Sequence, residues 1–205
     1  MTLDQAEQLL DDFLQDVLAT LGFQRMEPLI YSHPANEASA LLSFPCRLDA
    51  RGPACFGCSV WLRFESLEKH LRGPEAKATI PTISVPLHLL RENKSFMEWQ
   101  FYRPDDLENL REIILSDLQA YALPFIKQYS ILPELQIRLE SPNPKDWFVL
   151  GPEQRLNVLA VIQFVQGDKS GALKSLDDAL LERKAALPKK RLAIEILRKR
   201  LAQAV

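Results

Sequence analysis

Glycine is scarce in this chain, and the glycine-rich motifs of nucleotide-binding enzymes do not occur in it. Only 7 of its 205 residues are glycine, and neither G-x-G-x-x-G nor G-x-x-x-x-G-K-[ST] is found. The G-x-S-x-G elbow of serine hydrolases and the H-E-x-x-H pair of zinc proteases are missing as well. The sequence therefore predicts a protein that is not an enzyme, and it assigns no catalytic, cofactor-binding or metal-binding residue.

Cysteine and long apolar runs are also rare. Three cysteines are an odd number, which fits a reducing compartment better than a disulfide framework. No apolar run approaches the roughly 18 residues that span a bilayer, and the start, Met1-Thr-Leu-Asp-Gln-Ala-Glu-Gln, lacks the basic and apolar regions of a secretory signal. These features predict a cytoplasmic protein with no membrane partner.

Charge is nearly balanced overall but unevenly distributed. The net charge is −2, yet residues 152–205 hold 11 Lys/Arg against 6 Asp/Glu, giving +5. The preceding residues hold 14 against 21, giving −7. The basic stretch includes an apolar helical stripe that needs a protein surface, so we expect no nucleic-acid partner.

Helical and extended patterns alternate along the chain in a way typical of an α+β protein. Thr2 and Gln5 match a capping box for a helix over residues 3–21, which Gly22 can end. Residues 28–31, 38–48, 57–65, 79–88 and 95–102 read as strands, and helices are predicted from Pro104 to a stop or kink at Pro124 and over 153–166, 170–185 and 188–203. The doublets Asp11-Asp12 and Asp177-Asp178 are interpreted as solvated helix faces.

The predicted fold is an antiparallel sheet packed by the N-terminal helix and the central helix, with a C-terminal helical appendage. The boundaries are 1–140 for the sheet domain, 141–152 for a Pro-rich linker and 153–205 for the three-helix appendage. The expected core comprises Leu10, Phe13, Leu18, Phe23, Val60, Leu62, Trp99, Ile113, Leu118 and Phe164.

The C-x-x-C spacing of Cys55 and Cys58 allows a zinc knuckle, a redox pair or a structural turn. Zinc would need two further ligands, and the candidates Cys46, His33, His70 and His88 are irregularly spaced. A redox pair belongs at the start of a helix, whereas side chains after Cys58 alternate as in a strand. The structural interpretation is preferred: a turn shaped by nearby Gly and Pro, with Cys58 as a small buried residue.

Two resemblances suggest a function. The segment "RLNVLAVIQFVQGDKSGALKSLDDALLE" resembles one tetratricopeptide helical hairpin, with Gly167-Asp168 in its turn. The front of the chain, from the capped helix through "LGFQRMEPLIYSH", "VWLRF" and "MEWQFY" to Pro104, resembles uncharacterised bacterial domains that accompany toxins as immunity proteins. That resemblance implies an α+β domain that binds a protein without turnover.

The resulting hypothesis is a protein-binding protein, monomeric or homodimeric, that blocks a cognate toxin. Trp61, Arg63, Glu98 and Tyr102 are the candidate protein-binding residues, because strand alternation places each of them opposite the predicted core. The alternative for Trp61 is that a helix covers its side chain. The alternative function is a scaffold or adaptor whose C-terminal helices bind a peptide or dimerise.

Overall fold

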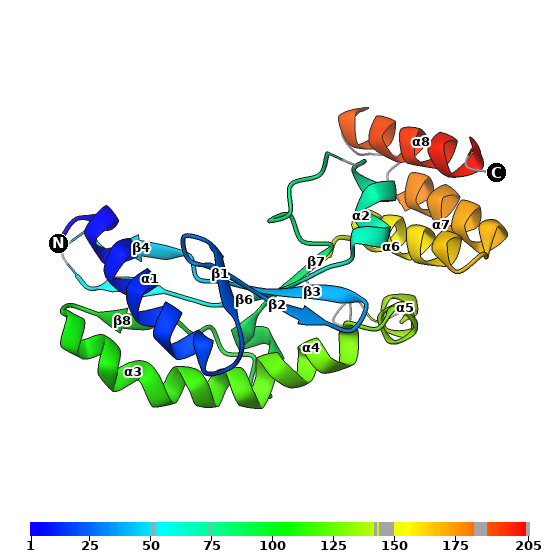
Figure 1. Ribbon diagram of the computed structural model, residues 1–205. Helices are drawn as coiled ribbons and strands as arrows, with labels where there is room; N and C mark the ends of the chain where they lie inside the picture. Colours follow the sequence, from blue (N-terminus) through cyan, green and yellow to red (C-terminus); the bar gives the residue numbers. More distant parts are fainter. Residues whose placement is uncertain (51, 74, 142, 144–149, 183–187, 204–205) are drawn as a thin grey trace. The chain divides into compact units, whose positions relative to one another are not determined.

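A computed structural model describes residues 1–50, 52–73, 75–141, 143, 150–182 and 188–203 (Figure 1). They form two compact units. Unit 1 combines Met1–Leu62 with Ser84–Ser130, and unit 2 combines Arg63–Ile83 with Ile131–Val205. The chain therefore passes from one unit to the other three times.

The division between units differs from the predicted domain boundary. Most of the predicted linker over 141–152 lies outside the described residues. Unit 2 holds more than the predicted appendage, because it also takes in residues 63–83 and 131–140. The charge asymmetry follows the two units: unit 1 has 8 Lys/Arg against 15 Asp/Glu, a net −7, and unit 2 has 17 against 12, a net +5.

Unit 1 is built on two antiparallel sheets, with the strand orders β1-β2-β3-β6-β7 and β4-β5-β8. The strands are β1 (Gln24–Glu27), β2 (Ile30–Ala35), β3 (Ala38–Ser43), β4 (Cys46–Leu48), β5 (Ala54–Phe56), β6 (Ser59–Arg63), β7 (Ile83–Pro86) and β8 (Trp99–Phe101). The helical elements are α1 (Leu3–Ala19), the 3₁₀-helix η1 (Leu87–Leu90), α3 (Pro104–Asp117), the π-helix η2 (Leu118–Ala122) and α4 (Leu123–Tyr129). Helix α1 packs against α3, β1 and β4, and α3 also packs against β8. The predicted α+β class is confirmed.

Helix α1 begins and ends as the sequence predicts. The Thr2 hydroxyl accepts from the Gln5 amide at 3.3 Å, and the Gln5 side chain accepts from the Thr2 amide at 2.8 Å. At the other end Gly22 takes φ +80°, and the Phe23 amide donates to the Leu18 carbonyl. This is the glycine-based helix stop expected from the sequence.

A buried carboxylate fixes α1 to the turn between β1 and β2. Asp11 accepts from the Leu29 amide at 2.9 Å and from the Tyr31 hydroxyl at 2.5 Å, and Arg25 lies 2.5 Å from its other oxygen. Burial and the Asp11 carboxylate together raise the pKa of Tyr31, so its hydroxyl stays a donor. The prediction that Asp11 lies on a solvated face was wrong, because α1 turns this residue toward the sheet.

Of the two outcomes predicted for Pro124, a helix stop or a kink, the stop is not observed. Helix α3 runs through η2 into α4, and Pro124 lies at the start of α4 (Figure 1). A proline ring clashes with the carbonyl four residues before it in a regular α-helix. The wider π turn immediately before Pro124 relieves that clash, so the chain stays helical.

Unit 2 is helical. Its elements are α2 (Glu65–Leu71), α5 (Leu132–Glu140), α6 (Pro152–Val165), α7 (Lys169–Glu182) and α8 (Pro188–Gln203), of which the last three confirm the predicted C-terminal helices. Helices α6 and α7 form a hairpin through Gly167, at φ +91°, and Asp168, whose side chain accepts from the Gly171 amide at 2.9 Å. Helix α2 packs against α6 and α8.

The core prediction succeeds at most positions. Eight of the ten expected residues are buried, and Phe164 is half-buried. Ile113 was wrongly placed in the core, since it is 51% exposed while its neighbour Ile114 is fully buried. Short elements were also missed: β1, β5, α2 and α5 were not predicted, and residues 32–35 lie in β2 where a turn was expected.

Candidate protein-binding surface

The outer face of the smaller sheet brings together two of the predicted binding residues. The strand register places Arg47 opposite Cys55 and Cys55 opposite Gln100, so these three side chains share one face. Glu98 directly precedes β8 and Tyr102 directly follows it, two residues on either side of Gln100. Glu98, predicted from alternation alone, is a neighbour of Arg47, and Tyr102 lies at the other end of β8.

An ion pair crosses this face from β4 to the residue before β8. Arg47 donates to both oxygens of Glu98, at 3.4 and 2.7 Å, and it also binds Asp49. The Glu98 carboxylate, followed by Asp49, raises the pKa of Arg47. The Arg47 side chain is 53% exposed and remains accessible to solvent or to a partner.

Two aromatic side chains extend from the same strand region into solvent. Phe96 is 73% exposed and Tyr102 is 64% exposed. Phe96 makes an edge contact to His88, with ring centroids 5.4 Å apart. Large exposed aromatic residues are the side chains that most often dominate protein–protein binding. We define the β8 face as Arg47, Phe96, Glu98, Gln100 and Tyr102.

The inner face of the smaller sheet gives the β8 face a firm backing. Phe56 and Trp99 are paired across β5 and β8, with ring centroids 5.3 Å apart. Phe101 meets Phe56 edge-on at 6.0 Å. All three rings are buried, so β8 is held in one position by aromatic packing.

The structure places Trp61 in the larger sheet. Trp61 lies on β6 and is half-buried, with Val60 and Leu62 buried on the opposite side of the strand. It therefore does not share a face with Glu98 and Tyr102, which belong to the smaller sheet.

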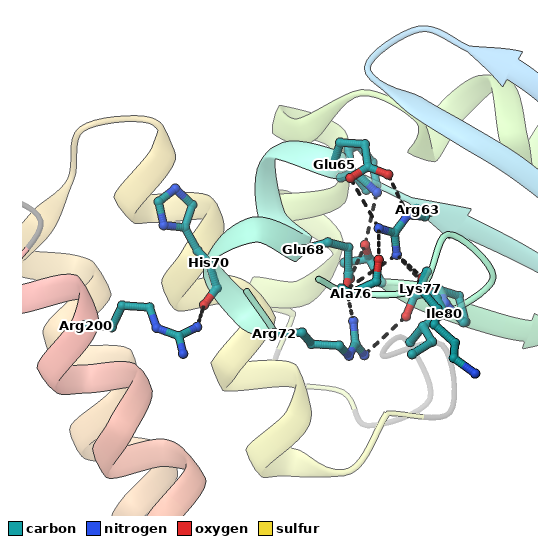
Figure 2. A network of polar contacts seen from close by, with 12 residues as sticks. Arg63, Glu65, Glu68, His70, Arg72, Ala76, Lys77, Ile80 and Arg200 are labelled. Carbon is teal, nitrogen blue, oxygen red and sulfur yellow. Dashed lines mark hydrogen bonds and ion pairs between the residues drawn. The ribbon is translucent and has the colours of Figure 1, made fainter. Parts of the chain in front are cut away.

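Arg63 is buried within unit 2, with only 4% of its side chain exposed (Figure 2). Its Nε donates to Glu65 at 2.8 Å. Its Nη1 donates to the carbonyls of Lys77 and Ile80, both at 2.8 Å, and its Nη2 donates to the Ala76 carbonyl at 3.3 Å. The guanidinium fork is thus filled by contacts inside the chain.

A second arginine completes this cluster around a buried acid (Figure 2). Glu68 is fully buried and accepts from Arg72 and, at 2.7 Å, from the Thr82 hydroxyl, while Arg63 lies 3.8 Å away. Arg72 also donates to the Pro81 carbonyl at 3.3 Å. The two arginines therefore hold four main-chain carbonyls of the segment between α2 and β7. We call Arg63, Glu65, Glu68, Arg72 and Thr82 the α2 clamp.

The cysteines of the C-x-x-C pattern are both buried and reduced. Cys55 lies on β5 rather than in a turn, so the turn prediction was wrong for this residue. Cys58 directly precedes β6 and is buried, as predicted. Burial raises the pKa of both thiols, and the negative charges of Asp49 and Asp117 raise them further. Neither sulfur has the low pKa of a nucleophile.

The histidines proposed as further ligands each pack on a phenylalanine ring. His33 lies 5.2 Å from Phe23, and His70 lies 5.3 Å from Phe164, between ring centroids. Among the residues that the structure describes, no three His, Cys, Asp or Glu side chains are grouped so that they could hold a metal ion.

A second buried acid of unit 1 lies where α3 meets the π turn. Asp117 has Arg91 3.4 Å away, and Arg91 also lies over the Tyr121 ring at 5.7 Å. Burial raises the pKa of Asp117, and Arg91 only partly opposes this. Asp117 is thus a buried carboxylate whose ion pair with Arg91 does not fully offset the cost of its burial.

Sequence reasoning missed Arg47 and Phe96 on the β8 face. Arg47 and Glu98 are 51 residues apart, and no local pattern connects them. Phe96 carried a usable signal, because it lies on the polar side of the predicted alternation in residues 95–102.

No protein-family model, curated protein or solved structure matches this chain. Within the described ranges, none of the helices has the length and apolar character needed to cross a membrane.

Proposed function

We propose that this chain is a non-catalytic binding protein that engages a protein partner through the β8 face. The observation that carries the proposal is the exposure of Phe96 and Tyr102 on either side of a firmly backed strand. Aromatic side chains have few rotatable bonds and lose little conformational entropy on binding, which favours their use as anchors.

The charge of unit 1 supports a basic partner. Its net charge of −7, from 8 Lys/Arg against 15 Asp/Glu, would speed encounter with a cationic surface. On the β8 face itself Arg47 and Glu98 neutralise each other, so affinity there would come mainly from the aromatic rings.

The state of the thiols supports binding over catalysis. Burial raises the pKa of Cys55 and Cys58, and each thiol therefore stays protonated near neutral pH. The carboxylate of Glu98, on the β8 face, is engaged by Arg47 instead of being directed toward a substrate.

A toxin neutralised by occlusion is the partner that the sequence resemblance favours, and a basic toxin would match the acidic unit 1. This narrower proposal depends on the binding proposal. If the partner is not a toxin, the narrower proposal fails and the binding proposal still stands.

Site-specific photocrosslinking tests the binding proposal even while the partner is unidentified. A photoreactive phenylalanine analogue would replace Phe96 or Tyr102 in the full chain, expressed in native cells. Ile113 on α3 is the matched control, because it is apolar and 51% exposed in the same unit. We expect a covalent adduct from positions 96 and 102 and none from 113. Equal adducts from all three positions, or none from 96 and 102, would refute the β8 face.

The captured protein then allows a binding measurement. We expect Phe96→Ala and Tyr102→Ala each to weaken binding by about 2 kcal/mol, the range of aromatic hot spots. Expression of the captured protein alone tests the toxin hypothesis: growth arrest that is relieved by this chain supports it. A harmless partner removes the toxin hypothesis and leaves the binding proposal intact.

A further inference from the structure

Helix α8 of unit 2 has two apolar faces, and only one of them is covered. Ile194, Leu197 and Leu201 are buried against unit 2. Leu192 and Ile196 lie on the opposite side, four residues apart, and are 56% and 49% exposed. A helix that only completes a core needs one apolar stripe, so the second stripe requires a separate explanation.

The uncovered stripe continues into hollowed surface. Lys199 and Gln203 follow Ile196 along the same side of α8, and together with Arg200 they line a shallow, open hollow. A second hollow, of about 500 Å³, lies between α7 and α8 and shares Lys199 and Gln203 with the first. We define the α8 outer face as Leu192, Ile196, Lys199, Arg200 and Gln203.

Contacts within unit 2 hold this face in a fixed position. Arg198 donates to Asp177 on α7 at 2.8 Å, and Arg200 donates to the His70 carbonyl on α2 at 2.7 Å. Leu197 and Leu201 are buried beneath the helix. The α8 outer face is therefore already ordered before a ligand binds, so binding does not have to fold it.

The charge of the surface indicates the chemistry of its occupant. In the described part of the chain, the ammonium group of Lys199 forms no ion pair, and it borders both hollows. Arg200 lies beside it and donates to the His70 carbonyl. Unit 2 as a whole carries a net +5, from 17 Lys/Arg against 12 Asp/Glu. An acidic ligand therefore fits this face.

We propose that the α8 outer face binds an acidic amphipathic helix of a partner protein. Leucine-type side chains spaced i, i+4 would pack on Leu192 and Ile196 and enter the hollows alongside, as ridges pack into grooves between helices. Carboxylates on the flanks of that helix would meet Lys199 and Arg200. This surface is separate from the β8 face and does not depend on it.

Two other occupants fit the observations less well. A second copy docked through the same face would bring two basic helices together, which like charges oppose. An anionic membrane would bind Lys199 and Arg200, but the exposed apolar part is small and has no aromatic residue to anchor it in the bilayer.

A pair of synthetic peptides tests the proposal on the full chain. One peptide carries leucines at i, i+4 and i+7 with glutamates flanking them, and the other replaces the glutamates with lysines. Fluorescence anisotropy should show binding of the acidic peptide only. We expect Leu192→Ser/Ile196→Ser to weaken its binding about tenfold or more, given the apolar area involved. Lys199→Glu should also weaken it, and more strongly at low salt.

Ile137→Ser is the matched control, because Ile137 is a more exposed apolar residue on α5 of the same unit. It should leave peptide binding unchanged, and circular dichroism should show each variant folded. Equal binding of both peptides, no binding of the acidic peptide up to about 1 mM, or indifference to the α8 variants would overturn the proposal. Two further results would overturn the proposal. One is concentration-dependent self-association that the Leu192→Ser/Ile196→Ser variant abolishes, and the other is flotation with phosphatidylserine vesicles that the same variant abolishes.

Discussion

Each unit of the molecule has an arginine held by carboxylates, and the two differ in what surrounds the charge. Arg47 of unit 1 is 53% exposed and binds Asp49 and Glu98 at the surface. Arg63 of unit 2 is 4% exposed and reaches, besides carboxylates, the carbonyls of a neighbouring segment. A salt bridge to a carboxylate therefore does not by itself indicate the role of an arginine. The other groups that the guanidinium contacts, such as main-chain carbonyls or solvent, indicate it.

The difference assigns different roles to the two arginines. A buried guanidinium whose donors are all filled cannot also contact a partner, so Arg63 shapes the segment between α2 and β7. An exposed guanidinium contributes little to stability, because water screens it and its side chain must be immobilised. Arg47 is the arginine that remains free to take part in binding.

The largest expected effect is at the α2 clamp. Replacing Arg63 by alanine leaves Glu68 buried with less compensation and frees three carbonyls. We expect the free energy of opening in this region to fall by about 3–5 kcal/mol, as for other broken buried ion pairs. Native-state hydrogen exchange at the amides of Ala76 and Ile80 would measure it, because both amides form turns in the held segment.

Arg63→Lys is the matched variant for this experiment. It keeps the positive charge but loses the planar fork, so its effect should lie between wild type and Arg63→Ala. Unchanged exchange at Ile80 in Arg63→Ala would show that the clamp does not hold the segment.

A pH-dependent effect is expected at Asp117, which has weaker compensation than Glu68. Its pKa is raised in the folded state, so the fold favours the protonated acid. That contribution is fully present below the ordinary aspartate pKa of about 4 and is lost as pH rises through the higher folded pKa. Asp117→Asn should remove this decline, and denaturation midpoints measured across the acidic and neutral range would reveal it.

Arg91→Gln sharpens the same test. Arg91 partly lowers the pKa of Asp117, so its removal should move the decline in stability to higher pH. Parallel pH profiles for wild type and Asp117→Asn would mean that Asp117 titrates alike in the folded and unfolded chain.

The smallest effect is expected at the exposed pair. Arg47→Gln and Glu98→Gln, alone and combined, should change stability far less than Arg63→Ala, and any coupling should vanish at high salt. Chemical denaturation in low and high salt measures both quantities. A loss comparable to that of Arg63→Ala would erase the contrast between the two arginines.

Much of the helical architecture could be predicted because its causes are local. The box formed by Thr2 and Gln5 and the stop at Gly22 depend on residues within one or two turns. Ile113 shows the limit of periodicity: it adjoins Ile114 in an apolar stripe, and only packing decides which of the two faces the core.

The candidate sites were less accessible to sequence reasoning. Strand alternation pointed to Tyr102, which is 64% exposed, but the alternation that selected Arg63 could not show that α2 and the following segment enclose it. The acceptors of Arg63 lie 13 to 17 residues further along, in a stretch without regular structure. Contacts of that kind follow from the path of the chain and not from any repeating pattern.

The path of the chain also sets the order in which a ribosome can complete the molecule. Unit 2 takes α2 from the middle of the sequence and α6 and α8 from its later part. Leu67 of α2, fully buried in the finished protein, has no α6 or α8 to cover it while unit 1 is still being synthesised. The nascent chain must therefore carry α2 without these partners until the later helices are made, and its buried side chains Leu67 and Glu68 are where a chaperone would be expected to bind.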